Sequence, residues 1–504
     1  MPKQRQSIPI VAPGSWGLNT EDSPSEIPLT YAAKADNCVI DKSGRLAARK
    51  GLLLTTTLST PLGSSDGIIS TLYHKNDAGD VGLFSSGNSK LFLGTDTLAD
   101  VSPAAYTITA DNWKFESFND EMWAFQRAHA PLKYDAGGTN LFVAIGGSAP
   151  EAHEVLGAAG RLWALDKTGN STVVYWSALL DGTNWTTGDS GSIDLDLVWP
   201  SGYDQGVGLA FFNNQLVIFG RKSIVLYQGA SDPSTMSLSD TVSGVGLLSR
   251  DCKVDIGTDL IFLSDDGLRS LGRTVATDGS QPLSDVAKQV RTDLIAQMGS
   301  QGASAPIKMA HNLKENIFLV IFSQSGITFC FDTKQMLQTN DYKATRWLTG
   351  INCANTDVTS TFYLGVTSGI CTYSGYQDIQ ATYNMTYLSN PSDLGAPDVN
   401  KILKKIKPVI IGNQTTDVIL KWGYGYGSSY STGVVTLSSG TGALYGVSLF
   451  NSGEFYTGGI VVNTPSIYTS GSGDVVSVGL EAVINGNPLS LQEMNMQLIT
   501  GRTL

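Results

Sequence analysis

Short apolar runs separated by small polar turns recur through most of the chain. In the clearest example, residues 215–219 and residues 223–227 form two apolar runs on either side of a turn at Gly220. β-Branched and aromatic residues fill both runs, and a breaker between two such runs is typical of a β-hairpin. Both faces of the first run are apolar, which predicts a strand that is covered on both sides.

This hairpin unit repeats along the chain. The first strands of the units are expected at residues 81–84, 121–125, 161–165, 215–219, 259–263, 316–320 and 361–365. The second strands are expected at residues 90–93, 131–134, 172–176, 223–227, 268–271, 327–331 and 370–373. A period of roughly 40 to 57 residues is in the range of propeller blades with about four strands each. The pattern predicts an all-β protein with a β-propeller of six or seven irregular blades over residues 66–375.

Two further regions flank the repeats. Residues 1–65 read as an extended arm followed by a hairpin with its turn at residues 41–44. Residues 376–504 predict a β-sandwich-like module whose last strand returns to the main body. Within this module, residues 401–410 alternate lysine with apolar residues at period two. This alternation predicts a half-buried strand with its lysines directed outward.

One surface helix is expected at about residues 284–298. Ser284 is its predicted N-cap, and Gly299 is expected to end it. Apolar residues recur at every fourth position from Val286 to Met298, which gives the helix a single apolar stripe. This stripe is expected to cover the helix's own domain.

Composition and charge narrow the class of function. The 504-residue chain is 41% hydrophobic and only 15% charged, with 55 glycines and a net charge of −12. An acidic balance argues against a protein that holds nucleic acid through phosphate contacts, but not against a wall past which DNA slides. The start is followed by no long apolar run, so no signal peptide and no membrane-spanning segment are expected. The five cysteines are scattered and are expected to be reduced: Cys38, Cys252, Cys330, Cys353 and Cys371.

No motif in the sequence carries recognisable catalysis. The four histidines, His74, His129, His153 and His311, are isolated from one another, and no nucleophile elbow, phosphate loop or dinucleotide fingerprint occurs. Residues 265–267 read Asp-Asp-Gly, which a hairpin turn explains better than a calcium loop. We therefore expect no catalytic residue, no cofactor-binding residue and no metal ligand, and a protein that is not an enzyme.

Two features suggest a glycan-directed function instead. Residues 181–185 resemble a loosened Asp-box turn of sialidase propellers, in which the Asp caps a hairpin and the Trp packs. Aromatic residues also crowd the C-terminal module and could form a sugar platform, although interface anchors are the commoner explanation. These aromatic residues are Tyr424, Tyr426, Tyr430, Tyr445, Phe455, Tyr456 and Tyr468.

Three stretches together resemble one protein family. The opening contains residues 17–20 (Gly-Leu-Asn-Thr), 36–39 (Asp-Asn-Cys-Val) and 43–51, which read Ser-Gly-Arg-Leu-Ala-Ala-Arg-Lys-Gly. The centre has the hairpins of residues 211–273, joined through Gly-Val-Gly-Leu-Leu at 244–248. The ending reads Leu-Gln-Glu-Met-Asn-Met-Gln-Leu at 491–498. In this order they are similar to the tail nozzle and tail hub proteins of short-tailed bacteriophages, which include tail tubular protein B and the packaged-DNA stabilisation proteins.

The resemblance implies a structural virion protein. It would form a homo-oligomeric ring, expected to be a hexamer, around the DNA channel, and it would retain the genome and conduct it during ejection. Its partners would be the portal and adaptor proteins above it, tail fibre, spike or needle proteins, and double-stranded DNA that passes without sequence-specific binding. The chain would lie in the virion tail after assembly in the host cytoplasm.

Other functions stay open from the sequence. A carbohydrate-binding or glycan-degrading propeller acting on the host surface is the main alternative, and a cellular scaffold propeller is a third. Asp194 and Asp196 are candidates for acidic residues facing a lumen, but solvated loop charges explain them equally well.

Overall fold

The computed structural model describes residues 6–56, 67–77, 79, 81–146, 148–277, 281–302, 305–412, 416–437 and 461–503. The chain is nearly all β and forms two compact units. The propeller unit comprises Leu54–Thr328 and Thr349–Thr372, and the sandwich unit comprises Met1–Leu53, Phe329–Leu348 and Tyr373–Leu504. The sequence placed boundaries at residues 65 and 375, whereas the observed units change at residues 53 and 372. The N-terminal and C-terminal regions share one unit.

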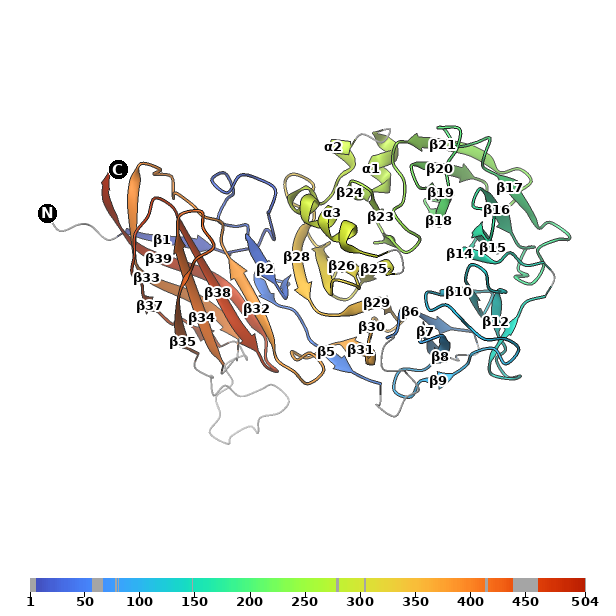
Figure 1. Cartoon of the computed structure of the whole chain (residues 1–504), viewed down its shortest axis with the longest axis horizontal. Coiled ribbons are helices and arrows are strands. Elements are labelled where there is room, and N and C mark those ends of the chain that lie inside the picture. Colours follow the sequence, from blue (N-terminus) through green and yellow to red (C-terminus); the bar gives the residue numbers. More distant parts are fainter. Residues whose placement is uncertain are drawn as a thin grey trace. The chain divides into compact units, whose positions relative to one another are not determined.

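The described residues of the propeller unit form six separate sheets (Figure 1). The first two are β6 (Ser70–Lys75), β7 (Val81–Gly87), β8 (Lys90–Leu93), β9 (Ala99–Asp100), then β10 (Lys114–Phe118), β11 (Glu121–Phe125), β12 (Leu132–Tyr134), β13 (Phe142–Ala144). The next two are β14 (Ala152–Ala158), β15 (Arg161–Lys167), β16 (Val173–Trp176), β17 (Gly191–Asp194), then β18 (Gly206–Phe212), β19 (Gln215–Gly220), β20 (Ser223–Gln228), β21 (Ser237–Ser243). The last two are β22 (Lys253–Asp255), β23 (Leu260–Ser264), β24 (Gly267–Ser270), then β29 (Ile351–Thr356), β30 (Phe362–Val366) and β31 (Gly369–Tyr373).

A seventh position in the ring is filled by β25 (Ile307–Asn312) and β26 (Ile317–Phe322), which pair antiparallel. β27 (Ile327–Asp332) continues the chain across the boundary between the units. One cavity is lined by residues of β6, β10, β14, β18, β22, β25 and β29, so the first strands of all seven positions surround it. The prediction of an irregular propeller with six or seven blades is confirmed.

The repeat read from the sequence corresponds to the middle strands of the blades. Its first strands are β7, β11, β15, β19, β23, β26 and β30, and its second strands follow them in each sheet. The turns before these strands need a left-handed backbone: Asn213 and Asn214, for example, have φ values of 49° and 61°. Asparagine tolerates this conformation well, which explains why small polar pairs precede the apolar runs.

Tryptophans fix two neighbouring blades in the same way. Trp123 in β11 and Trp163 in β15 are both fully buried. Their indole N–H groups donate to the carbonyls of Phe118 (3.1 Å) and Ala158 (3.0 Å), each five residues earlier in the chain. The ring therefore fills the core while its one polar atom is satisfied.

The helical region differs from the prediction. The structure has α1 (Leu271–Ala276), α2 (Gln281–Ser284), a 3-10 turn η1 (Lys288–Val290) and α3 (Arg291–Ser300) instead of one helix over residues 284–298. Ser284 ends α2, where its hydroxyl accepts from Arg269, and it is not an N-cap. The Oδ1 of Asp285 accepts from the amide of Ala287 at 2.9 Å. This local turn competes with helix formation, so α3 begins only at Arg291.

The sandwich unit has two groups of strands. One sheet contains β3 (Cys38–Ile40), β4 (Leu46–Ala48), β39 (Leu489–Thr503), β33 (Val399–Gly412) and β36 (Val462–Asn463), with β1 (Gln6–Val11) on β39 and β37 (Ile467–Tyr468) on β33. The other runs β28 (Lys343–Leu348), β2 (Lys34–Asp36), β32 (Tyr383–Leu388), β38 (Val476–Ile484), β34 (Asp417–Tyr424) and β35 (Ser431–Thr436). The expected hairpin with its turn at 41–44 is β3–β4, and the predicted last strand is β39.

The lysines of β33 do not all point outward. Lys401 is buried, and its ammonium donates to the carbonyl of Asp474 at 2.5 Å and to that of Ala396. Lys407 is exposed as predicted. Register shifts interrupt the pairing of β33 with β39, so a strict period of two cannot hold along the whole strand.

A buried arginine secures the N-terminal hairpin within the sandwich unit. Arg49 has no exposed surface, and its guanidinium forms two parallel bonds with Asp378, at 2.8 and 2.5 Å. It also donates to the side chain of Asn37 at 3.1 Å and lies 4.3 Å from the ring centre of Tyr383. Asn37 in turn accepts from the amide of Leu348 at 2.9 Å. The hairpin residues thereby bind three other segments of the unit.

The five cysteines are free and buried. Within the described ranges, no helix is long and apolar enough to cross a membrane.

Candidate functional site: the axial cavity of the propeller

The innermost strands of the propeller enclose a cavity of about 440 Å³. Volumes of this size are typical of small-molecule sites. Strands give alternate side chains to the cavity and to the cores between the blades, so charged residues can enter the axis without disturbing those cores. Four cationic side chains line the cavity, Lys114, Arg250, Lys253 and Lys308. The carboxylates that line it are Glu154, Asp251 and Asp255.

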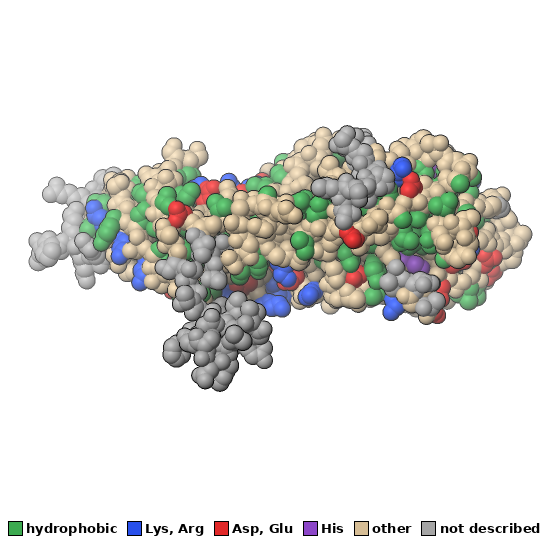
Figure 2. All heavy atoms as spheres, turned by 90° about the horizontal axis from the view of Figure 1, so that it is seen from below, with side chains coloured by type: hydrophobic (Ala, Val, Ile, Leu, Met, Phe, Trp, Pro, Cys, Tyr) green, Lys and Arg blue, Asp and Glu red, His purple; other side chains and the backbone are tan. Residues whose placement is uncertain are grey.

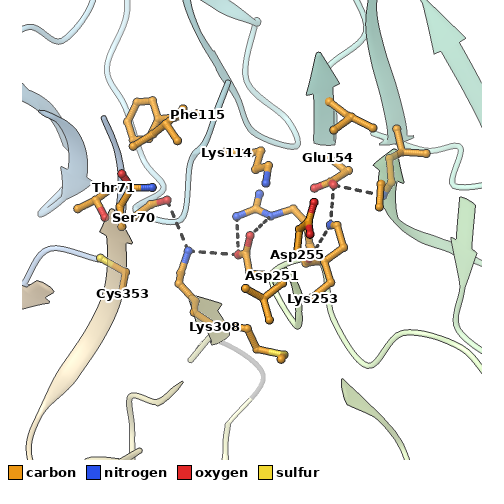
Figure 3. A pocket seen from close by; sticks show the side chains of 18 of the residues that line it. Ser70, Thr71, Lys114, Phe115, Glu154, Asp251, Lys253, Asp255, Lys308 and Cys353 are labelled. Carbon is orange, nitrogen blue, oxygen red and sulfur yellow. Dashed lines mark hydrogen bonds and ion pairs between the residues drawn. The ribbon is translucent and has the colours of Figure 1, made fainter. Parts of the chain in front are cut away.

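Asp251 is the centre of one ion network (Figure 3). Its carboxylate accepts from Arg250 at 2.9 and 3.1 Å and from the ammonium of Lys308 at 3.2 Å. Lys308 also donates to the side-chain oxygen of Asn112 at 2.7 Å. Burial alone would raise the pKa of Asp251, but the two cations outweigh burial and hold this pKa well below its usual range. The carboxylate is therefore ionised and fully engaged.

Glu154 and Lys253 form a second network beside the first. The ammonium of Lys253 donates to Glu154 Oε1 at 2.7 Å and to the carbonyl of Arg250 at 2.7 Å. The amide of Leu209 donates to the same Glu154 oxygen at 3.2 Å. Burial and the neighbouring Lys114 lower the pKa of Lys253, although Glu154 opposes this effect. Oε1 of Glu154 thus has two donors, whereas its Oε2 is buried without a hydrogen-bond partner among the described residues.

Lys114 differs from the other cations of the cavity. Among the described residues it has no hydrogen-bond partner, although its ammonium lies in the field of Glu154 and Asp251. Burial would lower its pKa, but these carboxylates, Glu154 most strongly, raise it above the ordinary lysine value. Lys114 therefore carries its charge into the cavity, and Figure 3 shows its side chain directed toward Asp251.

A second cavity, of about 400 Å³, shares Arg250 and Asp251 with the axial cavity. It is lined by residues at the beginning of the inner strands, such as His153 and Ile307, and by Met298 of α3. Arg250 also donates to the carbonyls of His153 at 2.7 Å and Asn112 at 3.0 Å. Side chains that bond one another across several blades therefore lie between the two cavities.

The histidines are not brought together. His74 contacts Ser117 Oγ at 2.8 Å, and His153 contacts Gln126 Oε1 at 2.7 Å. Burial and Arg250 lower the pKa of His153 to about 2, so this ring is neutral. Across the ranges that the structure describes, no group of three or more His, Cys, Asp or Glu side chains could hold a metal ion.

The Asp-box-like turn is structural. Asp181 Oδ1 accepts from the amide of Thr183 at 2.9 Å, and the indole of Trp185 donates to the carbonyl of Gly182 at 2.8 Å. Trp185 is buried in the core between two blades, where its ring lies 6.2 Å from that of Phe125. The arrangement matches the capping and packing roles expected for such a turn.

The other singled-out residues lie at turns and surfaces. Asp266 pairs with Arg269 at 2.5 Å in the β23–β24 turn, as a hairpin predicts. Asp194 and Asp196 are exposed at the end of β17. Tyr426 and Tyr468 are well exposed, whereas the hydroxyl of Tyr424 bonds Ser470 at 3.3 Å. Tyr430 is half-buried, and Tyr445, Phe455 and Tyr456 lie outside the described residues.

The charged residues of the axis were missed by the sequence analysis. Arg250 and Asp251 lie in the turn before β22, and the others sit on the innermost strands, where alternation with apolar residues is poor. A signal was nevertheless present, because Lys114 and Glu154 each lie five residues before the turn residues Asn119 and Ala159. Aligning the residues before each turn would have placed these charges on equivalent inner strands.

Comparisons with known proteins give similarity of fold only. No protein-family model and no curated protein matches the chain. Among solved structures, the extracellular domain of a putative hybrid two-component system from B. thetaiotaomicron aligns at 10% identity and a TM-score of 0.40, over 65% of this chain and 40% of that one. The WD40 domain of Toxoplasma gondii coronin aligns at 8% identity and 0.36, over 73% and 85%. An exo-β-1,3-galactanase from Phanerochaete chrysosporium aligns at 10% identity and 0.29, over 91% and 100%.

Proposed function

We propose that this chain is a structural subunit of a short-tailed phage tail nozzle, forming a homo-oligomeric ring that retains the genome and conducts it during ejection. One observation carries the proposal: the stretches that resemble this family form joints of the architecture. The opening stretch is the β3–β4 hairpin, and the closing stretch is β39, which pairs with it at Ala47↔Ser490 and Leu46↔Leu491.

The central stretch is also a joint, between two blades. The amide of Leu247 donates to the carbonyl of Gly220 at the end of β19, and that of Leu248 to the carbonyl of Leu263 in β23. A Cβ at Gly246 would lie 2.4 Å from backbone atoms of Arg221 and Gly220. Only glycine fits such an approach, so the Gly-Val-Gly-Leu-Leu segment serves blade connection. Residues that connect blades in this way suit a rigid building block.

The axis of the propeller is unsuited to DNA. The axial cavity measures about 440 Å³ and is crossed by the Arg250–Asp251 network. The major groove of B-DNA alone is about 12 Å wide, and the whole duplex is wider still. A duplex therefore does not fit into a cavity of this volume. The proposed channel would therefore be enclosed by several subunits. On the face in Figure 2, charged side chains are sparse, which suits a wall with few phosphate contacts.

Electron microscopy of the purified chain and of particles from the infected host tests the proposal. A ring of six copies below a portal is expected, with genes for a portal and a terminase beside this one. A monodisperse monomer in both particles and assembly intermediates would refute the ring.

A glycan-directed function is the second candidate, and the axial cavity is the observation that favours it. The cavity has a small-molecule volume and polar groups on several strands. Screening the chain against host surface glycans, with assays for both binding and new reducing ends, tests this candidate. The absence of both glycan binding and new reducing ends would refute this candidate.

A further inference from the structure

We propose that the axial cavity binds a small organic anion, whose carboxylate or phosphate group lies on Lys114 and whose body packs against apolar side chains of the lining. This binding site does not depend on the nozzle function, since it belongs to a single propeller.

The charge of the lining favours an anion. Four cations face three carboxylates, so the lining carries one net positive charge in a chain whose net charge is −12. Asp251 has its donors already, from Arg250 and Lys308. Glu154 accepts from Lys253 and an amide through Oε1 alone, and its Oε2 is buried without a hydrogen-bond partner among the described residues. Asp255 accepts from the amide of Gly257 at 2.6 Å.

Lys114 supplies the unsatisfied charge. Its three ammonium hydrogens meet no acceptor among the described residues, whereas Lys308 contacts Asn112, Asp251 and Ser70. Burial lowers the pKa of Lys253, and the neighbouring charge of Lys114 lowers it further, so the two ammonium groups repel each other. An oxyanion on Lys114 would complete its hydrogen bonds and relieve this repulsion, and charge-assisted bonds of this kind are the strong ones.

The remaining lining accepts an apolar body. Leu72, Leu156 and Phe211 come from three different inner strands, are only partly buried in the cores between the blades, and line the cavity. A small-molecule site commonly combines such an apolar wall with a few placed polar groups. A ligand with a charged end and an apolar body fits both parts.

Calorimetry of the full chain with three probes tests the inference. Benzoate has both a charge and a ring, benzyl alcohol has the ring alone, and inorganic phosphate has the charge alone. Benzoate is expected to bind in low salt at least about tenfold more tightly than either of the others. Its affinity is expected to fall with added salt. No benzoate binding up to about 10 mM, or equal binding of benzyl alcohol, would overturn the proposal.

Variants locate the site. Lys114→Gln is expected to weaken benzoate binding by about tenfold or more, and Lys114→Arg to retain most of it. Lys222→Gln removes the same charge from an exposed turn and is expected to leave affinity unchanged. Phe211→Ala is expected to weaken benzoate but not phosphate. Unchanged benzoate affinity in Lys114→Gln, with a thermal midpoint equal to that of Lys114→Arg, would refute the assignment. Equal affinities for benzoate and phosphate would refute the part of the proposal in which an apolar body packs against the lining.

Discussion

The buried Arg49 is expected to contribute far more stability than its neighbour Arg45 in the same hairpin. Arg49→Ala removes two charge-assisted bonds to Asp378 and a cation–π contact with Tyr383 at 4.3 Å. It also leaves the Asp378 carboxylate without the fully buried guanidinium that it binds. Breaking a buried pair from one side costs about 3–5 kcal/mol. This loss corresponds to a change of more than about a hundredfold in the folding equilibrium of the sandwich unit.

Urea unfolding and hydrogen exchange of β3, β4 and β32 measure this effect. Arg45→Ala is the matched control, because Arg45 pairs with Asp41 at 2.9 Å while both side chains stay about one-fifth exposed. A pair accessible to water is worth about 1 kcal/mol or less. If Arg49→Ala cost no more than Arg45→Ala, the argument that this hairpin is held by a buried ion pair would be wrong.

Three further outcomes are expected. Gly246→Ala should destabilise the propeller unit by about 1–3 kcal/mol in urea unfolding, since its new Cβ would meet backbone at 2.4 Å, whereas Gly299→Ala has open space and should be neutral or stabilising. Burial raises the pKa of Glu116 from 4.5 to about 7, so the folded state favours the neutral acid and stability falls as pH rises from about 4.5 through about 7. Glu116→Gln should therefore match the wild type near pH 4 and exceed it by about 1–3 kcal/mol above pH 7 in denaturant titrations, and parallel curves would contradict this. Trp185→Ala should lower the free energy of unfolding by about 3–5 kcal/mol, because it empties a buried position. Thermal unfolding measures this loss, and the control Leu197→Ala, at an exposed position, should show no such loss.

The propeller could be predicted because its middle strands are apolar on both faces. Runs such as residues 215–219 stand out against the polar turns, and they mark seven positions in the ring. The innermost strands could not be predicted in this way, because one of their faces meets the polar axis. Lys114 and Glu154 interrupt the alternation that identifies a strand, and Lys253, the partner of Glu154, comes from a blade far away in the sequence.

The start of the helix was mispredicted for a related reason. A stripe of apolar residues every four positions is compatible with burial in a turn as well as in a helix, and Val286 is fully buried outside any helix. The side chain of Asp285 forms a hydrogen bond that competes with the start of a helix, and the periodicity of apolar residues does not reveal this bond. Similarly, the sequence predicts that Lys401 faces solvent, whereas in the structure two backbone carbonyls accept hydrogen bonds from its ammonium.

The pairing of β39 with both β1 and β4 has a consequence for synthesis on the ribosome. The propeller strands from β6 to β26 are translated well before residue 489 emerges, so they can pair while the sandwich unit still lacks a central strand. Until then, the unpaired edges of β4 and β33 are templates for pairing with other chains. Nascent polypeptides stalled before this point should therefore bind chaperones through the sandwich unit while their blades already resist protease.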